Sequence, residues 1–186
     1  MRTTVRTSTA KAATSRPRTV QRIRALVVVD STGLTQRVLN YLGRLASNGE
    51  SPEFHLVYIG SRVPARLLET GGAERADRED ELQSSLRRQQ RAWMERADKQ
   101  AWRILRAAES TLQHAGVEPQ RIHASVSSPL DAREAVDEVL LLARDQGCDT
   151  VIVGHTAHSW LGALGGGDLP EQLVRRAKGY AVWVIG

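Results

Sequence analysis

The feature that most constrains the fold is a strand, a glycine-rich loop, a helix and a second strand at the end of the sequence. Strand-like runs extend from Thr150 to Gly154 and from Ala181 to Ile185. Between them, apolar residues recur at helical spacing at Leu169, Leu173, Val174 and Ala177. This order predicts a βαβ unit in a parallel sheet, with its loop at the carboxyl edge where α/β proteins bind ligands.

The same alternation of strands and helices runs back to residue 25. Strands are expected at 25–30, 54–59, 122–126, 150–154 and 181–185, and helices at 34–45, 78–114, 131–145 and 169–177. The first helix is expected to be capped near Thr32 or Thr35, while Gly116 and Gly147 are placed to end the second and third. We therefore predict an α/β fold with a single doubly wound parallel sheet of five strands and right-handed crossovers.

The helix expected at 78–114 is longer than a small sheet can cover at about 1.5 Å per residue. Its amino-terminal half is therefore expected to project or to pack on a partner. Trp102 lies away from the apolar stripe and is either a partly covered surface residue or a contact for another subunit or protein. The stripe itself consists of Leu82, Leu86, Trp93, Ala97, Ala101, Ile104, Leu105, Ala108 and Leu112.

Charge is unevenly distributed along the 186 residues, whose net charge is +5. Seven basic residues and no acid fall within residues 1–24, so this segment carries +7 and the remainder −2. We predict that residues 1–23 form a disordered basic tail and that residues 24–186 form the folded domain. The tail is open to three interpretations: a solvated extension, an arm that binds nucleic acid or an acidic protein, or an organelle transit peptide.

Two further sequence features bound the class of protein. No apolar run approaches the roughly 20 residues that a bilayer helix requires, so no membrane association is expected. Cys148 is the single cysteine, which excludes an internal disulfide framework and fits a reducing compartment. Beside an expected strand, it is interpreted as a small buried residue.

The terminal βαβ unit resembles the universal stress protein family (UspA-like domain), whose ATP-binding members carry Gly-x2-Gly-x9-Gly-Ser/Thr between the last two strands. The corresponding positions here are Gly154, Ala157, Gly167 and Asp168, so two of the four match. The resemblance covers residues 24–186 and implies the adenine nucleotide alpha hydrolase-like fold with strand order 3-2-1-4-5 and, here, an extended central helix. It also implies a cytoplasmic homodimer that pairs through residues 181–185.

The resemblance implies a candidate nucleotide site at the switch point of the sheet, with a degenerate ATP-binding motif. Asp30 matches the family position near the sugar and base, although it is also placed to cap the first turn. Asp168, followed by Pro170 and Glu171, forms a capping-box sequence whose carboxylate competes with phosphate for the same N–H groups. The full set of candidate binding residues is Asp30, Gly154, His155, Ala157, Gly165, Gly166, Gly167 and Asp168.

Catalysis is not indicated by any motif. The sequence has no Gly-x4-Gly-Lys-Ser/Thr and no Gly-x-Ser-x-Gly elbow, and His155 and His158 lack an acid or thiol partner that would define a metal site. We expect a non-catalytic universal stress protein-like regulator with weak or lost ATP binding and no metal beyond nucleotide-bound magnesium. The alternative is an adaptor that docks a partner through the long helix, while the basic tail binds nucleic acid or an acidic protein.

Overall fold

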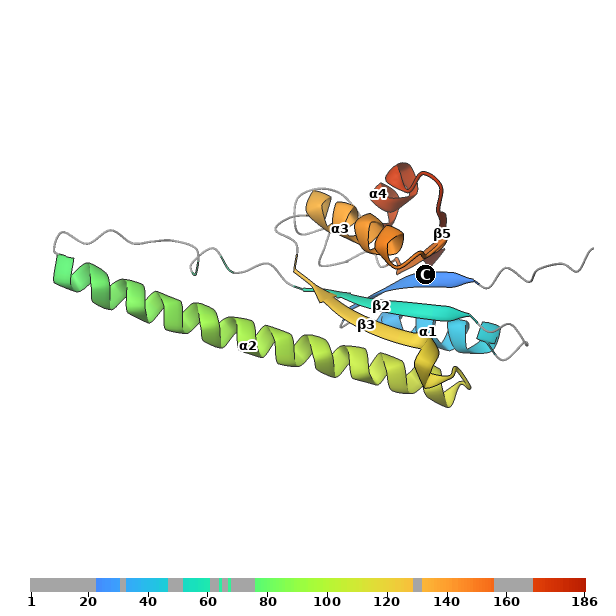
Figure 1. Ribbon diagram of the computed structural model, residues 1–186, viewed down its shortest axis with the longest axis horizontal. Coiled ribbons are helices and arrows are strands. Elements are labelled where there is room, and N and C mark those ends of the chain that lie inside the picture. The colour runs from blue at the N-terminus through green and yellow to red at the C-terminus, as the bar shows by residue number, and fades with distance from the viewer. Residues whose placement is uncertain are drawn as a thin grey trace, which may run out of the picture.

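The computed structural model describes residues 23–30, 33–46, 52–60, 64, 67, 76–128, 132–155 and 169–186. The basic tail before residue 23 and most of the connection at 61–75 lie outside these ranges. Within them the chain forms β1 (Arg24–Val29), α1 (Gly33–Ala46), β2 (Glu53–Ile59), α2 (Ala76–His114), the 3-10 turn η2 (Pro119–Arg121), β3 (Ile122–Ser127), α3 (Ala132–Asp145), β4 (Thr150–Gly154), α4 (Leu169–Arg176) and β5 (Ala181–Ile185) (Figure 1).

All the strands pair in parallel in one five-stranded sheet with the order β3-β2-β1-β4-β5. The chain builds outward from β1 to β3 in one direction and from β4 to β5 in the other. The strand order therefore reverses between β1 and β4, which is the switch point of a doubly wound sheet. This confirms the predicted fold class and strand order.

Helices cover both faces of the sheet (Figure 1), which explains why the central strands are apolar without alternation. Alternate residues of β1 enter two separate cores: Val27 faces α1 and α2, whereas Leu26 and Val28 face α3 and α4. The first core also contains Val38, Leu39, Leu42, Phe54, Leu56, Leu105 and Leu112, and the second contains Val57, Ile59, Val136, Val139, Val151, Leu169 and Leu173.

The 39-residue helix α2 is about 58 Å long at 1.5 Å per residue, whereas the strands beneath it have at most seven residues. Its carboxyl-terminal half is buried at Ala101, Leu105, Ala108 and Leu112. Its other half runs past the edge at which the strands end (Figure 1), and Leu82 is 50% exposed there. The predicted projection is confirmed, and the apolar stripe is buried only where the sheet lies beneath it. We call residues 76–92 the arm.

Two predicted helix ends are confirmed by backbone geometry. Gly116 follows α2 with φ 94°, and Gly147 follows α3 with φ 63°. After α2, the N–H of Val117 donates to the carbonyl of Leu112 and that of Gly116 to Gln113; the equivalent bonds follow α3. These are Schellman motifs, in which a left-handed glycine lets the last carbonyls of a helix find donors.

None of the helices in the described part of the chain combines the length and the apolar content that a bilayer crossing requires.

Candidate functional site

The candidate nucleotide site lies where β1 and β4 end side by side. These strands pair in parallel, with Val27 opposite Ile152. Asp30 and Gly154 follow shortly after these paired residues and so reach the same edge of the sheet. After these strands the chain continues to α1 on one face of the sheet and to α4 on the other, the arrangement at which α/β sheets bind ligands. The structure therefore brings Asp30, Gly154 and His155 to the predicted edge.

Asp30 is hydrogen bonded to the first turn of α1. The Thr35 hydroxyl donates to Asp30 Oδ1 at 2.7 Å, and the Asp30 N–H donates to Thr35 Oγ1 at 3.0 Å. Thr35 is in the first turn of a helix that begins at Gly33, so it does not occupy the capping position considered for it; Thr32 lies outside the described residues. The Asp30 side chain therefore stabilises the turn between β1 and α1, which is one of the two roles that the sequence allowed for it.

A buried tyrosine lies near Asp30 at the same edge of the sheet. Tyr58 on β2 has a raised pKa, first because it is buried and then because of the nearby Asp30 charge, so its phenol stays protonated. It also lines a cavity of about 180 Å³ between α2 and the ends of β2 and β3, together with Trp93, Ala97 and Val126. This cavity lies at the same edge of the sheet as Asp30 and is shaped by α2.

At the end of β4, the backbone is hydrogen bonded to β5 and His155 is exposed. Gly154 is in register with Ile185 on β5, and the N–H of His155 donates to the Ile185 carbonyl at 2.8 Å. Of the predicted binding residues, Ala157, Gly165, Gly166, Gly167 and Asp168 lie outside the described residues, as does His158.

Helix α4 begins at Leu169, directly after Asp168 in the sequence, as the capping-box interpretation requires. Glu171 in its first turn is exposed and accepts a hydrogen bond from Arg175 Nη2 at 2.7 Å. Asp168 itself lies outside the described residues, so its capping role stays a prediction.

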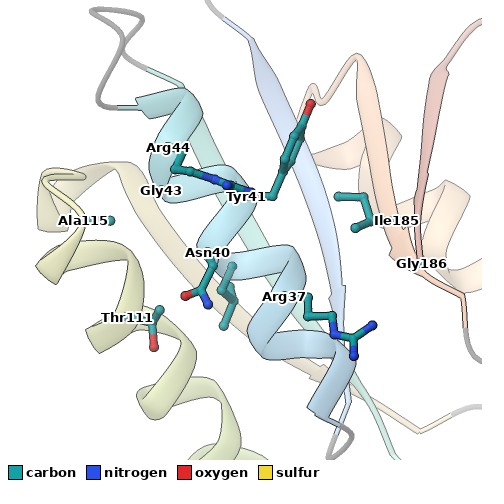
Figure 2. A pocket seen from close by; sticks show the side chains of 10 residues that line it. Arg37, Asn40, Tyr41, Gly43, Arg44, Thr111, Ala115, Ile185 and Gly186 are labelled. Atoms are coloured by element: carbon teal, nitrogen blue, oxygen red, sulfur yellow. The ribbon is translucent and has the colours of Figure 1, made fainter.

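A second concave region, of about 680 Å³, lies around α1 (Figure 2). Figure 2 shows Arg37, Tyr41 and Arg44 on α1, with the end of α2 on one side and Ile185 on the other. The Tyr41 ring meets that of Trp183 on β5 edge to face, with centroids 6.5 Å apart. This region therefore continues the apolar surface of β5 onto α1.

One cluster of side chains in the structure was not predicted from the sequence. Glu53 and His55 on β2 meet His123 on β3 at the amino-terminal edge, with the two histidine rings stacked at 4.6 Å. Burial and then the His123 charge lower the pKa of His55. Burial also acts to raise the pKa of Glu53, but Arg24 and the two histidines together lower it. The available signal was Glu53-x-His55 within an apolar strand, but its pairing with His123 depends on the strand register.

Cys148 is buried, as predicted. Burial, followed by the charge of Asp149, raises the pKa of its thiol to about 11. The thiol therefore stays protonated at neutral pH, which supports a packing role.

The sequence model of the Universal stress protein family matches residues 22–185. A protein of that family from Burkholderia pseudomallei has a TM-score of 0.53 and 18% identity, over 88% of this chain and 96% of its own. A universal stress protein in complex with cAMP gives 0.55 and 16%, over 88% and 95% of the two chains. The Archaeoglobus fulgidus universal stress protein in complex with dAMP gives 0.50 and 16%, over 88% and 98%. No curated protein matches the chain. At these identities, the likeness to solved structures shows the fold alone.

Proposed function

Because the chain belongs to the universal stress protein family, we propose that it is a non-catalytic regulator whose switch-point site binds adenine nucleotide weakly or not at all. The observation that carries this proposal is the acid at position 168, directly before α4, where the family pattern has a hydroxyl residue. A carboxylate at a helix cap accepts the N–H groups that would otherwise receive a phosphate, and its charge repels the triphosphate. In this proposal, the carboxylate of Asp168 occupies the N–H groups at the start of α4 that would otherwise bind a phosphate.

Two other features support weak nucleotide binding. Ala157 adds a Cβ at a position where the family pattern has glycine, which limits how closely the backbone approaches a ligand. Asp30, the residue proposed for the sugar and base, is already hydrogen bonded to Thr35. The nucleotide class itself is supported by two family structures, which were solved with cAMP and dAMP. ATP with magnesium is the form proposed for this chain.

A cytoplasmic homodimer through residues 181–185 is part of the same proposal. β5 is the terminal strand of the sheet, and Val184 on it is 44% exposed. Tyr41 and Trp183 extend this apolar surface onto α1. A second copy pairing at β5 would remove both the strand edge and these side chains from water.

The nucleotide content of the purified full-length protein tests the proposal. We expect that denaturing the protein and analysing the released small molecules by mass spectrometry will show adenine nucleotide far below one equivalent per chain. A universal stress protein-like domain with the complete glycine motif, prepared in the same way, is the positive control. Stoichiometric adenine nucleotide would overturn the proposal, because it would show that Ala157 and Asp168 are tolerated.

Exposed apolar side chains along α2 favour a second candidate function, an adaptor that docks a protein partner through this helix. Leu82 and Met94 are exposed on this helix, and Trp102 is 40% exposed. In this function the basic tail would bind nucleic acid or an acidic protein. If the adaptor function holds, deleting residues 1–22 is expected to abolish salt-sensitive binding to RNA, DNA or polyglutamate. Binding that is unchanged by the deletion would rule out the role given to the tail.

A further inference from the structure

Three potential metal ligands converge at the amino-terminal edge of the sheet, opposite the edge that carries the switch point. Parallel pairing sets His55 on β2 directly against His123 on β3. Glu53 precedes His55 by two residues, and alternation along a strand places both side chains on the same face. One ligand atom of each residue lies within 4.8 Å of the others. The sheet thus gathers two imidazole nitrogens and a carboxylate oxygen around one point.

The two distances from Glu53 to the histidines match those between the ligands of a tetrahedral metal ion. Glu53 Oε1 lies 3.4 Å from His55 Nε2 and 3.3 Å from His123 Nε2. Two ligands about 2.0–2.1 Å from a zinc ion, at the tetrahedral angle, lie about 3.3–3.4 Å apart. The imidazole rings are stacked, with centroids 4.6 Å apart, so one ring has to turn before both Nε2 atoms point at the same ion, and the half-exposed His123 is the ring that can turn.

His55 supplies an independent sign that a partner belongs here. Its side chain is 10% exposed, and its Nε2 is one of two buried side-chain nitrogen or oxygen atoms in the described ranges that make no hydrogen bond. Its contact with Glu53 Oε1, at 3.4 Å, is a long ion pair. Buried polar atoms are normally satisfied, and a bond to a metal ion would satisfy this one.

The surroundings also suit a metal ion. Arg24 Nε donates to Glu53 Oε2 at 3.0 Å, which leaves Oε1 turned toward the histidines. An outer hydrogen bond of this kind orients a ligating carboxylate, and the half-exposed guanidinium is screened by water. A cavity of about 100 Å³ lies beside the two histidines and is also lined by Ser125 and Gln146, so the cluster is open to small molecules on this side.

We propose that Glu53, His55 and His123 bind a divalent transition-metal ion such as zinc. Imidazole nitrogens favour zinc over magnesium or calcium, which take oxygen ligands. His123 is 47% exposed, so an ion can enter from solvent, while His55 holds it against the sheet. The bound ion joins β2 to β3 at the edge away from the nucleotide site, so this inference stands or fails independently of the proposed function.

Isothermal titration of the untagged full-length protein with ZnCl2 tests the site. We expect one equivalent to bind and to raise the melting temperature, because an ion that binds only the folded state stabilises it. We expect His123→Gln to weaken the affinity at least about tenfold and to remove the thermal shift. The His123 ring is half-exposed, so this change removes a ligand without opening a core cavity. Tetrahedral Co2+ absorption, present in the parent and lost in the variant, is the second readout.

Two control variants separate this site from other zinc ligands in the chain. His114→Gln removes an exposed histidine at the end of α2, and Cys148→Ser removes the thiol; both are expected to leave zinc affinity unchanged. Absence of saturable zinc binding would overturn the proposal and leave the cluster as an ion pair of β2 and β3. Zinc binding that survives His123→Gln with unchanged affinity would also overturn it, whatever the control variants show.

Discussion

Replacing Leu105 with alanine is expected to lower the free energy of unfolding by about 2–5 kcal/mol. Leu105 is fully buried in the core that α1 and α2 form against the sheet. The substitution removes buried apolar surface and leaves a cavity among side chains from several elements, which relax only partly. Urea denaturation followed by circular dichroism measures the change, with the slope of the transition compared between variants.

Leu82→Ala is the matched control, because it makes the same substitution on the same helix. Leu82 is on the arm and half-exposed, so its replacement is expected to change the free energy of unfolding by no more than about 0.5 kcal/mol. A loss at Leu82 as large as that at Leu105 would contradict the account, because it would mean that the arm is packed against something in solution. That result would favour the adaptor function.

Most of the fold could be predicted from the sequence, because the spacing of apolar residues indicates helices and strands and the positions of glycines indicate where helices end. β4 and β5 have the predicted limits, and α2 begins two residues before the predicted start at residue 78. Gly116 and Gly147 mark helix ends because only a left-handed residue closes the Schellman motif there. The strand order 3-2-1-4-5 came from the family resemblance, since pairing between distant strands leaves no local signal.

The features that the sequence did not predict all depend on tertiary geometry. The length of α2 predicted that its first half projects, but periodicity alone did not show which residues of the apolar stripe remain exposed, as Leu82 does. The meeting of His55 and His123 depends on the β2–β3 register, which neither strand specifies alone. Asp30 was placed at the correct edge, but its bond to Thr35 became visible only when β1 and α1 were positioned.

Replacing Asp168 with serine and Ala157 with glycine is expected to strengthen ATP binding at least about tenfold, which corresponds to about 1.4 kcal/mol. The change removes a negative charge beside the proposed phosphate position and a Cβ that limits backbone approach. Serine is itself a good amino-terminal cap, so α4 should keep its start and the fold its stability. Glu171→Gln is the control, because it removes a charge from the same turn at a side chain already paired with Arg175.

The most direct measurement of the self-capped site is an isothermal titration of ATP with magnesium into the parent, the Asp168→Ser/Ala157→Gly variant and the Glu171→Gln control. The account predicts no saturable binding by the parent or the control up to roughly millimolar ATP, and saturable binding by the double variant. Micromolar binding by the parent, or a double variant no tighter than the parent, would contradict the claim that the chain's own acid closes the site.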